Sequence, residues 1–253
     1  MIKQRVEDDI LIVSLEHGKT NSITLEMLMQ LKEIIDNLNQ NPMPKGLILT
    51  GSGRFFSSGF HLPIFLNFKD QKDVVSFFKV EEEILLSLFT CKKPVVSAIN
   101  GHAAAGGLIF AMATDYRIAK NHPKIKLGMT EIKIGLSLTV VQAGVMRFGL
   151  DTKKKFRDIM CLGEMYDVTK SKELDIIDEI AEEDALIPRA KQIICNFIDT
   201  PNRVFMDIKQ LWKNESAELI RKELESNTWH DKLNAFFKKD VRDAIAFVQA
   251  TME

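Results

Sequence analysis

Two glycine-containing segments, residues 51–62 (GSGRFFSSGFHL) and 100–108 (NGHAAAGGL), are the parts of this sequence most suited to chemistry. Each follows a short apolar run that predicts a β-strand, so each is expected to form a loop at a strand end. Two such loops can aim backbone N–H groups at one point and form an oxyanion hole, which stabilises negative charge on an acyl oxygen. Gly106 and Gly107 lead into the apolar residues 108–113, which predict a buried helix whose first amides favour an anion.

A third candidate for chemistry is the carboxylate of Glu131, which comes just after a short predicted strand. Its neighbours Met129, Ile132 and Ile134 are apolar, so we expect this carboxylate to be buried. Burial raises the pKa of a carboxyl group and suits a base that works near neutral pH.

Four segments of the chain resemble the crotonase superfamily, which is the enoyl-CoA hydratase/isomerase group. They occur in the family's order, and the similarity extends from the strand near Ile10 to Lys239 and Asp240. The resemblance implies an α/β fold, a crotonase-like right-handed spiral of ββα repeats with a C-terminal helical region. It also implies an acyl-CoA thioester substrate, no metal, and no cofactor beyond the coenzyme A of the substrate. The segments are 56–62 (FSSGFHL), 96–107 (VSAINGHAAAGG), 115–118 (DYRI) and 128–136 (GMTEIKIGL).

The resemblance assigns the oxyanion hole to the backbone N–H groups of Phe60 and Gly106, and the acid/base role to Glu131. Hydratases of the family use a second glutamate three residues after the oxyanion glycine, where this chain has Ile109. One carboxylate is enough to move a proton from C2 to C4, so the chain resembles the Δ3,Δ2-enoyl-CoA isomerase branch. The alternatives are an enoyl-CoA hydratase or other single-carboxylate crotonase reaction, and a non-catalytic acyl-CoA- or partner-binding protein of the same fold.

The predicted contacts to coenzyme A lie around the first loop and near the C-terminus. Lys19 and Lys239 are candidates for contacts to the phosphate groups of coenzyme A. His61 stands where the family commonly has an aspartate. This histidine could act as an acid or base, but we favour the interpretation that it is a hydrogen-bonded loop residue whose side chain faces away from the site. Phenylalanines in residues 65–89 could line an acyl pocket, although aromatic residues at this spacing more often form ordinary core. The predicted contacts are Lys19, Ser57, Ser58, His61, Leu62, Phe236 and Lys239.

Composition narrows the class of protein. A chain of 253 residues with 45% hydrophobic and 27% charged residues predicts one large folded domain, or a core with a small appendage. The net charge of −1 gives no bulk attraction to nucleic acid or to an anionic membrane. The odd number of cysteines, the missing secretory leader and the absence of a long apolar run predict a cytoplasmic protein with reduced thiols.

Strand-like and helix-like segments alternate in the first half of the chain, which predicts an α/β fold with parallel strands. From about residue 139 the pattern is helical throughout, and a composition shift near residue 199 suggests a core of residues 1–199 and a helical oligomerisation region of residues 200–253. The family resemblance implies a homotrimer or a dimer of trimers. The predicted strands are 10–15, 47–50, 95–99, 116–119 and 125–127, and the predicted helices are 22–39, 80–89, 108–113, 168–175, 184–198, 203–213, 216–237 and 240–251.

Overall fold

The computed structural model describes residues 1–226 and 228–252. Its larger sheet has the strand order β1-β2-β3-β5-β7-β10, in which β1 and β2 pair antiparallel and the other neighbours are parallel. The central strands are buried along almost their whole length, as expected for parallel strands that are covered on both faces. The strands are β1 (Ile2–Glu7), β2 (Ile10–Leu15), β3 (Gly46–Gly51), β5 (Val95–Ile99), β7 (Tyr116–Lys120) and β10 (Glu179–Ala181).

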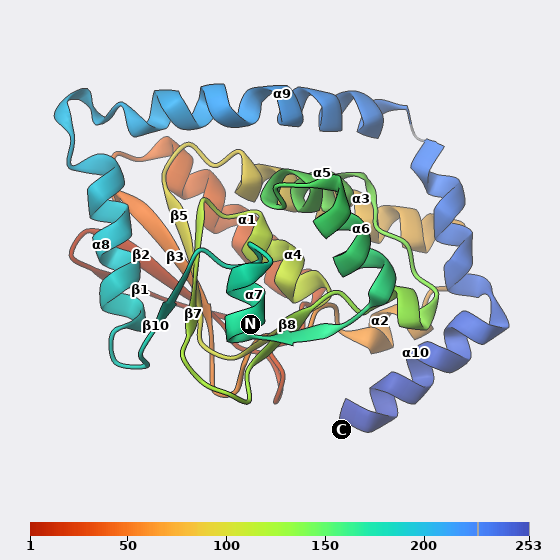
Figure 1. Ribbon diagram of the computed structural model, residues 1–253. Coiled ribbons are helices and arrows are strands. Elements are labelled where there is room, and N and C mark those ends of the chain that lie inside the picture. Colours follow the sequence, from red (N-terminus) through yellow and green to blue (C-terminus); the bar gives the residue numbers. More distant parts are fainter. Residues whose placement is uncertain (227, 253) are drawn as a thin grey trace.

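A second, smaller sheet has the order β4-β6-β8-β9, with β9 antiparallel to β8. The strands β3, β5 and β7 are each followed by one strand of this smaller sheet and then by a helix (Figure 1). This alternation confirms the predicted spiral of ββα repeats. Each of the five predicted strands begins and ends within one residue of its predicted boundaries. The smaller sheet consists of β4 (Phe55–Ser57), β6 (His102–Ala104), β8 (Lys126–Gly128) and β9 (Met165–Asp167).

The helices cover the two sheets and form most of the C-terminal part. The first helix begins at Leu25 rather than at Ser22, because Ile23 pairs with Phe60 and the Thr24 side chain caps the helix. The helices are α1 (Leu25–Gln40), α2 (Leu62–Leu66), α3 (Gln71–Phe89), α4 (Gly106–Met112), α5 (Val140–Gly149), α6 (Lys153–Leu162), α7 (Val168–Glu173), α8 (Leu186–Ile198), α9 (Phe205–Glu225) and α10 (Lys239–Met252), with 3₁₀ turns η1 (Glu131–Ile134), η2 (Pro201–Arg203) and η3 (Thr228–Phe237).

The prediction that the chain is helical throughout after residue 139 is wrong in part. Two short strands, β9 and β10, lie in that region and extend the two sheets. Each has three half-buried residues, which is too short for an alternating pattern to show. The predicted helices 203–213 and 216–237 are also redistributed, because α9 continues through the gap between them and ends at Glu225.

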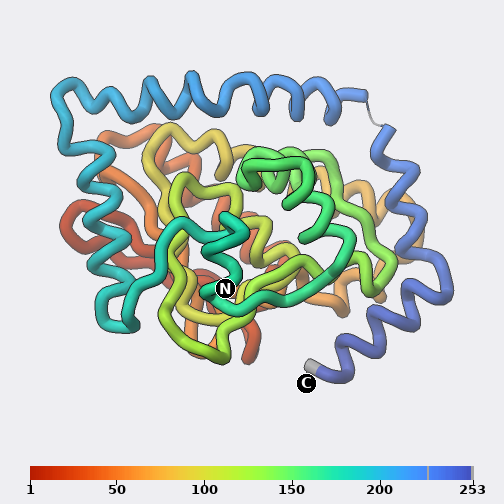
Figure 2. Tube along the Cα trace, viewed as in Figure 1, coloured from red at the N-terminus to blue at the C-terminus, as the bar shows by residue number. Residues whose placement is uncertain are grey.

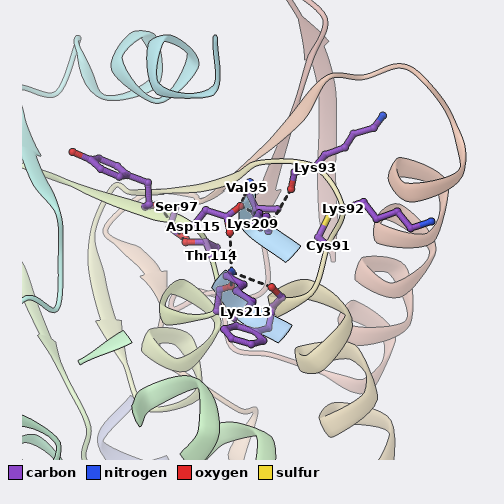
Figure 3. A network of polar contacts seen from close by, with 12 residues as sticks. Cys91, Lys92, Lys93, Val95, Ser97, Thr114, Asp115, Lys209 and Lys213 are labelled. Atoms are coloured by element: carbon purple, nitrogen blue, oxygen red, sulfur yellow. Dashed lines mark hydrogen bonds and ion pairs between the residues drawn. The ribbon is translucent and has the colours of Figure 1, made fainter. Parts of the chain in front are cut away.

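A buried ion cluster fastens α9 to the core. Figures 1 and 2 show α9 lying along one side of the molecule between α8 and the C-terminal elements. Lys209 Nζ is 2.6 Å from Asp115 Oδ2 and Lys213 Nζ is 2.7 Å from Asp115 Oδ1, with all three side chains almost fully buried (Figure 3). Asp115 also accepts a hydrogen bond from the Val95 N–H at 2.8 Å. Burial lowers the pKa of Lys213 to about 8, and the charge of Asp115 opposes this shift.

Candidate active site

A cavity of about 570 Å³ opens between the two glycine-containing loops, η1 and the C-terminal elements. The first loop contributes Ser58 and Phe60, and the second contributes Ala104 and Ala105. By surface area the wall is mostly apolar, so a ligand with a hydrophobic chain could enter the cavity. The C-terminal elements add Phe236 from η3 and Val248 from α10.

The first loop turns sharply at Gly59, whose φ of +94° favours glycine. A side chain here would also collide with the second loop, because an added Cβ would lie 3.0 Å from the Gly106 nitrogen. Hydrogen bonds from Ile23 N to Gly59 O (2.8 Å) and from His61 N to Ile23 O (2.9 Å) fix the loop on both sides of Phe60. The Phe60 N–H itself has no backbone acceptor in the described part of the chain.

The second loop turns at Ala105, which has a φ of +52° although it carries a side chain. A non-glycine residue in this conformation stores strain of about 1–3 kcal/mol, and such residues cluster at functional sites. The Ala105 N–H donates to Gly128 O at 3.0 Å, and α4 starts at the next residue. Within the residues that the structure describes, the Gly106 N–H likewise has no backbone acceptor. The two predicted oxyanion donors therefore lie on loops in direct contact.

Glu131 begins η1, three residues after β8, and its side chain lines the cavity. The residue is half-buried as a whole, but its Oε2 is closed off from solvent and has no hydrogen-bond partner among the described residues. This burial raises the pKa of Glu131 to about 7, and hydrogen bonds from the local backbone only partly oppose the rise. Its carboxylate is therefore poised to exchange a proton near neutral pH.

Ile109 lies on α4 in the hydrophobic core and does not line the cavity. Across the described part of the wall, Glu131 contributes the sole carboxylate. The described residues also contain no group of three or more His, Cys, Asp or Glu side chains that could hold a metal ion.

The predicted coenzyme A contacts fall into two groups. Lys19, Ser58, Leu62 and Phe236 line the cavity, whereas three others do not. The buried Ser57 hydroxyl donates to Asn21 O at 2.8 Å and accepts from Gly59 N at 3.2 Å, so this side chain shapes the loop.

The two remaining residues point elsewhere. His61 Nδ1 lies 3.2 Å from Ser22 Oγ, and its ring packs edge-on against His17 at 5.0 Å. The exposed Lys239 pairs with Asp243 at 2.7 Å. Binding of coenzyme A by any of the seven residues therefore stays a prediction.

Sequence reasoning missed several polar residues of the cavity wall, among them Arg54, Lys133 and Gln142. Arg54 lies inside the first glycine-containing segment and Lys133 lies two residues after Glu131, so position alone could have indicated both. Gln142 had no such signal, because its place at the wall depends on how α5 starts. Its side-chain oxygen accepts from Thr139 N at 3.1 Å in a capping box.

The phenylalanines of residues 65–89 divide between wall and core. Phe65 and Phe78 line the cavity, whereas Phe68 and Phe77 pack behind them and Phe89 lies elsewhere in the core. Part of this segment therefore lines the cavity and part forms ordinary core, and its use as an acyl pocket stays a prediction.

No helix within residues 1–226 and 228–252 has both the length and the apolar composition to cross a lipid bilayer.

Several known proteins are similar to this chain in sequence and in fold. The chain is 23% identical to enoyl-CoA delta isomerase 1, mitochondrial, of Mus musculus, across 91% of this chain and 79% of the mouse protein. It is 24% identical to a probable enoyl-CoA hydratase of Bacillus subtilis, across 94% of this chain and 96% of that protein. The crystal structure of human mitochondrial delta3-delta2-enoyl-CoA isomerase superposes with a TM-score of 0.90 at 19% identity, covering 99% of this chain and 97% of the human one.

Residues 5–247 match the sequence profile of the enoyl-CoA hydratase/isomerase family. The match covers almost the whole spiral, both glycine-containing loops and Glu131. A relative named as an isomerase and a relative named as a hydratase are identical to this chain at nearly the same percentage of residues. The fold agrees with the family profile, and this chain belongs to the enoyl-CoA hydratase/isomerase family.

Proposed function

We propose that this protein is an enoyl-CoA isomerase that shifts a double bond from position 3 to position 2 of an enoyl-CoA. The observation that carries the proposal is the composition of the cavity wall. Among its described residues, one carboxylate, Glu131, accompanies two loops that bear unpaired N–H groups. A 1,3-proton shift needs one group that both removes and returns a proton, and this wall supplies one.

The proposed reaction starts with the thioester oxygen held by the N–H groups of Phe60 and Gly106. The ionised Glu131 removes a proton from C2, and the electron pair moves through the carbonyl group to give a dienolate, whose charge the two N–H groups stabilise. The protonated Glu131 then delivers the same proton to C4, which leaves the double bond between C2 and C3. The reaction is chemically balanced as written, so it requires no redox partner and no cofactor besides the coenzyme A of the substrate.

Cationic side chains at the cavity suit a substrate with phosphate groups. Lys19, Arg54 and Lys133 all line it, and their positive charge would attract the phosphates of coenzyme A. An enoyl-CoA hydratase is the second candidate, because relatives with that name are equally similar. That reaction must orient a water molecule as well as move a proton, and Ile109 cannot assist it. A non-catalytic acyl-CoA-binding protein would have no need for a buried Glu131.

The proposal is tested by replacing Glu131 with glutamine. Glu131→Gln should still bind a CoA ester but should lose about 10² to 10⁴ in kcat for isomerisation, because the amide cannot take up the proton. Glu173→Gln, on the exposed surface of α7, is the matched control and should turn over normally. In the wild type, kcat/KM should rise with pH through about 7 as Glu131 ionises. Normal turnover by Glu131→Gln would remove Glu131 from the mechanism and contradict the proposed function.

A further inference from the structure

The proposed isomerase chemistry restricts where the end of the acyl chain can lie, and the inference in this section rests on that chemistry. The Phe60 and Gly106 N–H groups would fix the thioester carbon C1. Glu131 must then reach both C2 and C4. The part of the chain beyond C4 must therefore continue past Glu131, away from the oxyanion loops.

A second cavity lies on the far side of Glu131. It has a volume of about 490 Å³ and shares part of its wall with the first cavity, namely Glu131, Leu136 and Ser137. Its apolar lining includes Leu138, Phe156 and Met160. The two cavities are thus neighbours, with the proposed base at their junction.

The phenylalanines beside the first cavity pack closely against one another. Phe60 packs against Phe65 and Phe77 with ring centroids 5.7 Å apart, and Phe65 packs against Phe236 at 5.0 Å. Such distances are those of aromatic rings in direct contact. A long chain directed into this cluster would have to displace rings that already stabilise the core.

The second cavity is large enough for a long acyl tail. A methylene group is close in volume to a water molecule, which occupies about 30 Å³ in the liquid. The cavity therefore has room for on the order of ten carbon atoms in loose packing. The Phe156 ring on α6 is held in place by Arg147, whose guanidinium carbon lies 5.4 Å from the ring centroid.

We propose that the second cavity binds the distal part of the acyl chain, and that the substrates are long-chain 3-enoyl-CoA esters. Met160, which lines this cavity from α6, is then a specificity-determining residue. Each methylene moved from water into the cavity should improve kcat/KM about fourfold until the space is filled.

The test compares 3-enoyl-CoA esters of six, ten and fourteen carbons. The wild type should show kcat/KM increasing with chain length. Met160→Trp, which fills the cavity, should lower kcat/KM for the fourteen-carbon ester at least about tenfold, because several methylenes lose their site. The six-carbon ester should change by less than about twofold, since its chain ends near Glu131.

Two further variants keep this test decisive. Met160→Ala enlarges the cavity and should leave the six-carbon ester unaffected while still accepting the longest one. Met29→Trp, at an exposed methionine on α1, is the matched control and should leave the whole profile unchanged. Isomerisation with the same chain-length profile in the wild type, Met160→Trp and Met160→Ala would overturn the second-cavity proposal alone. A wild-type protein that isomerises no 3-enoyl-CoA of any length would overturn the proposed function itself.

Discussion

At the scale of single residues, the two oxyanion loops depend on each other. A Cβ added to Gly106 would lie 3.0 Å from Phe60 Cε2, so the Phe60 ring fills the space that a side chain at Gly106 would need. The neighbouring ring therefore favours glycine at this position, in addition to any approach of the substrate, because a side chain here would have to push the ring aside. A change at Gly106 should therefore disturb both N–H donors.

We predict that Gly106→Ala lowers kcat on the order of 10², the effect expected for one misplaced oxyanion donor. A second substitution, Phe60→Leu, should recover part of this loss, because a smaller side chain makes room for the new methyl group. Steady-state kinetics of the two single variants and the double variant provide the test. Unchanged kinetics in a folded Gly106→Ala protein would show that this loop has a structural role only.

At the scale of elements, α3 carries a buried pair of carboxyl groups, Glu81 and Glu82, and Glu82 holds the start of α5. Glu82 accepts hydrogen bonds from the Thr139 hydroxyl and from the Val141 N–H, the latter at 3.0 Å. Its neighbour Glu81 is fully buried, and within the described residues neither of its carboxylate oxygens has a hydrogen bond of ordinary geometry. Burial raises the pKa of Glu81 well above its ordinary value, with the charge of Glu82 adding to the rise, and burial raises the pKa of Glu82 to about 7.

We predict that this pair makes stability depend on pH. Between about pH 4.5 and 7 the folded protein keeps protons that the unfolded chain has released, so the free energy of unfolding should fall as pH rises through this range. Glu81→Gln should reduce that fall, because the amide cannot ionise. Urea unfolding at about pH 5 and about pH 8 measures the change in the free energy of unfolding between these pH values. The exposed Glu83→Gln should keep the wild-type pH dependence, and an identical dependence in Glu81→Gln would contradict the account.

The elements that could be predicted from sequence are those long enough to show a pattern. The apolar runs of β2, β3 and β5 and the periodic face of α1 gave clear signals. Among the three-residue strands of the smaller sheet, β8 was predicted as residues 125–127, whereas β4, β6 and β9 were not. β4 and β6 lie inside the glycine-containing segments and are defined by pairing between distant residues.

The candidate site likewise has features that could be predicted from sequence and features that could not. The contact between the two loops follows from their positions at neighbouring strand ends, but the burial of Glu131 does not follow from its neighbours in sequence. Met129 is buried, whereas Ile132 is 48% exposed. The position of Gln142 and the second cavity depend on the packing of α5 and α6, which no local pattern encodes.

At the scale of the whole molecule, α9 has two very different faces. One face is tied to the core through Lys209 and Lys213. The outer part of this segment carries large apolar side chains that are 40–80% exposed, which is unusual for a surface in contact with water alone. We therefore keep the prediction of a homotrimer or a dimer of trimers and place part of its interface on α9. These side chains are Val204, Ile208, Leu211, Trp212 and Leu219.

We predict that Leu211→Glu, at the most exposed of these positions, shifts the protein towards monomer in sedimentation-velocity experiments. The introduced charge would have to be buried in the interface without a partner. Lys222→Glu, a charge change on the same helix, is the control and should leave the sedimentation coefficient unchanged. A wild-type protein that sediments as a monomer at micromolar concentration would contradict the predicted assembly.

The most direct measurement of the central claim is product analysis in heavy-oxygen water. The wild-type protein is given a 3-enoyl-CoA, and in a parallel reaction crotonyl-CoA, with the products identified by mass spectrometry. The account predicts rapid conversion of the 3-enoyl-CoA to the 2-enoyl-CoA and little label in any 3-hydroxyacyl-CoA, because Glu131 has no second carboxylate in the described cavity wall with which to activate water. Incorporation of label at C3 at a rate equal to or faster than isomerisation would contradict the account and assign the protein to the hydratases.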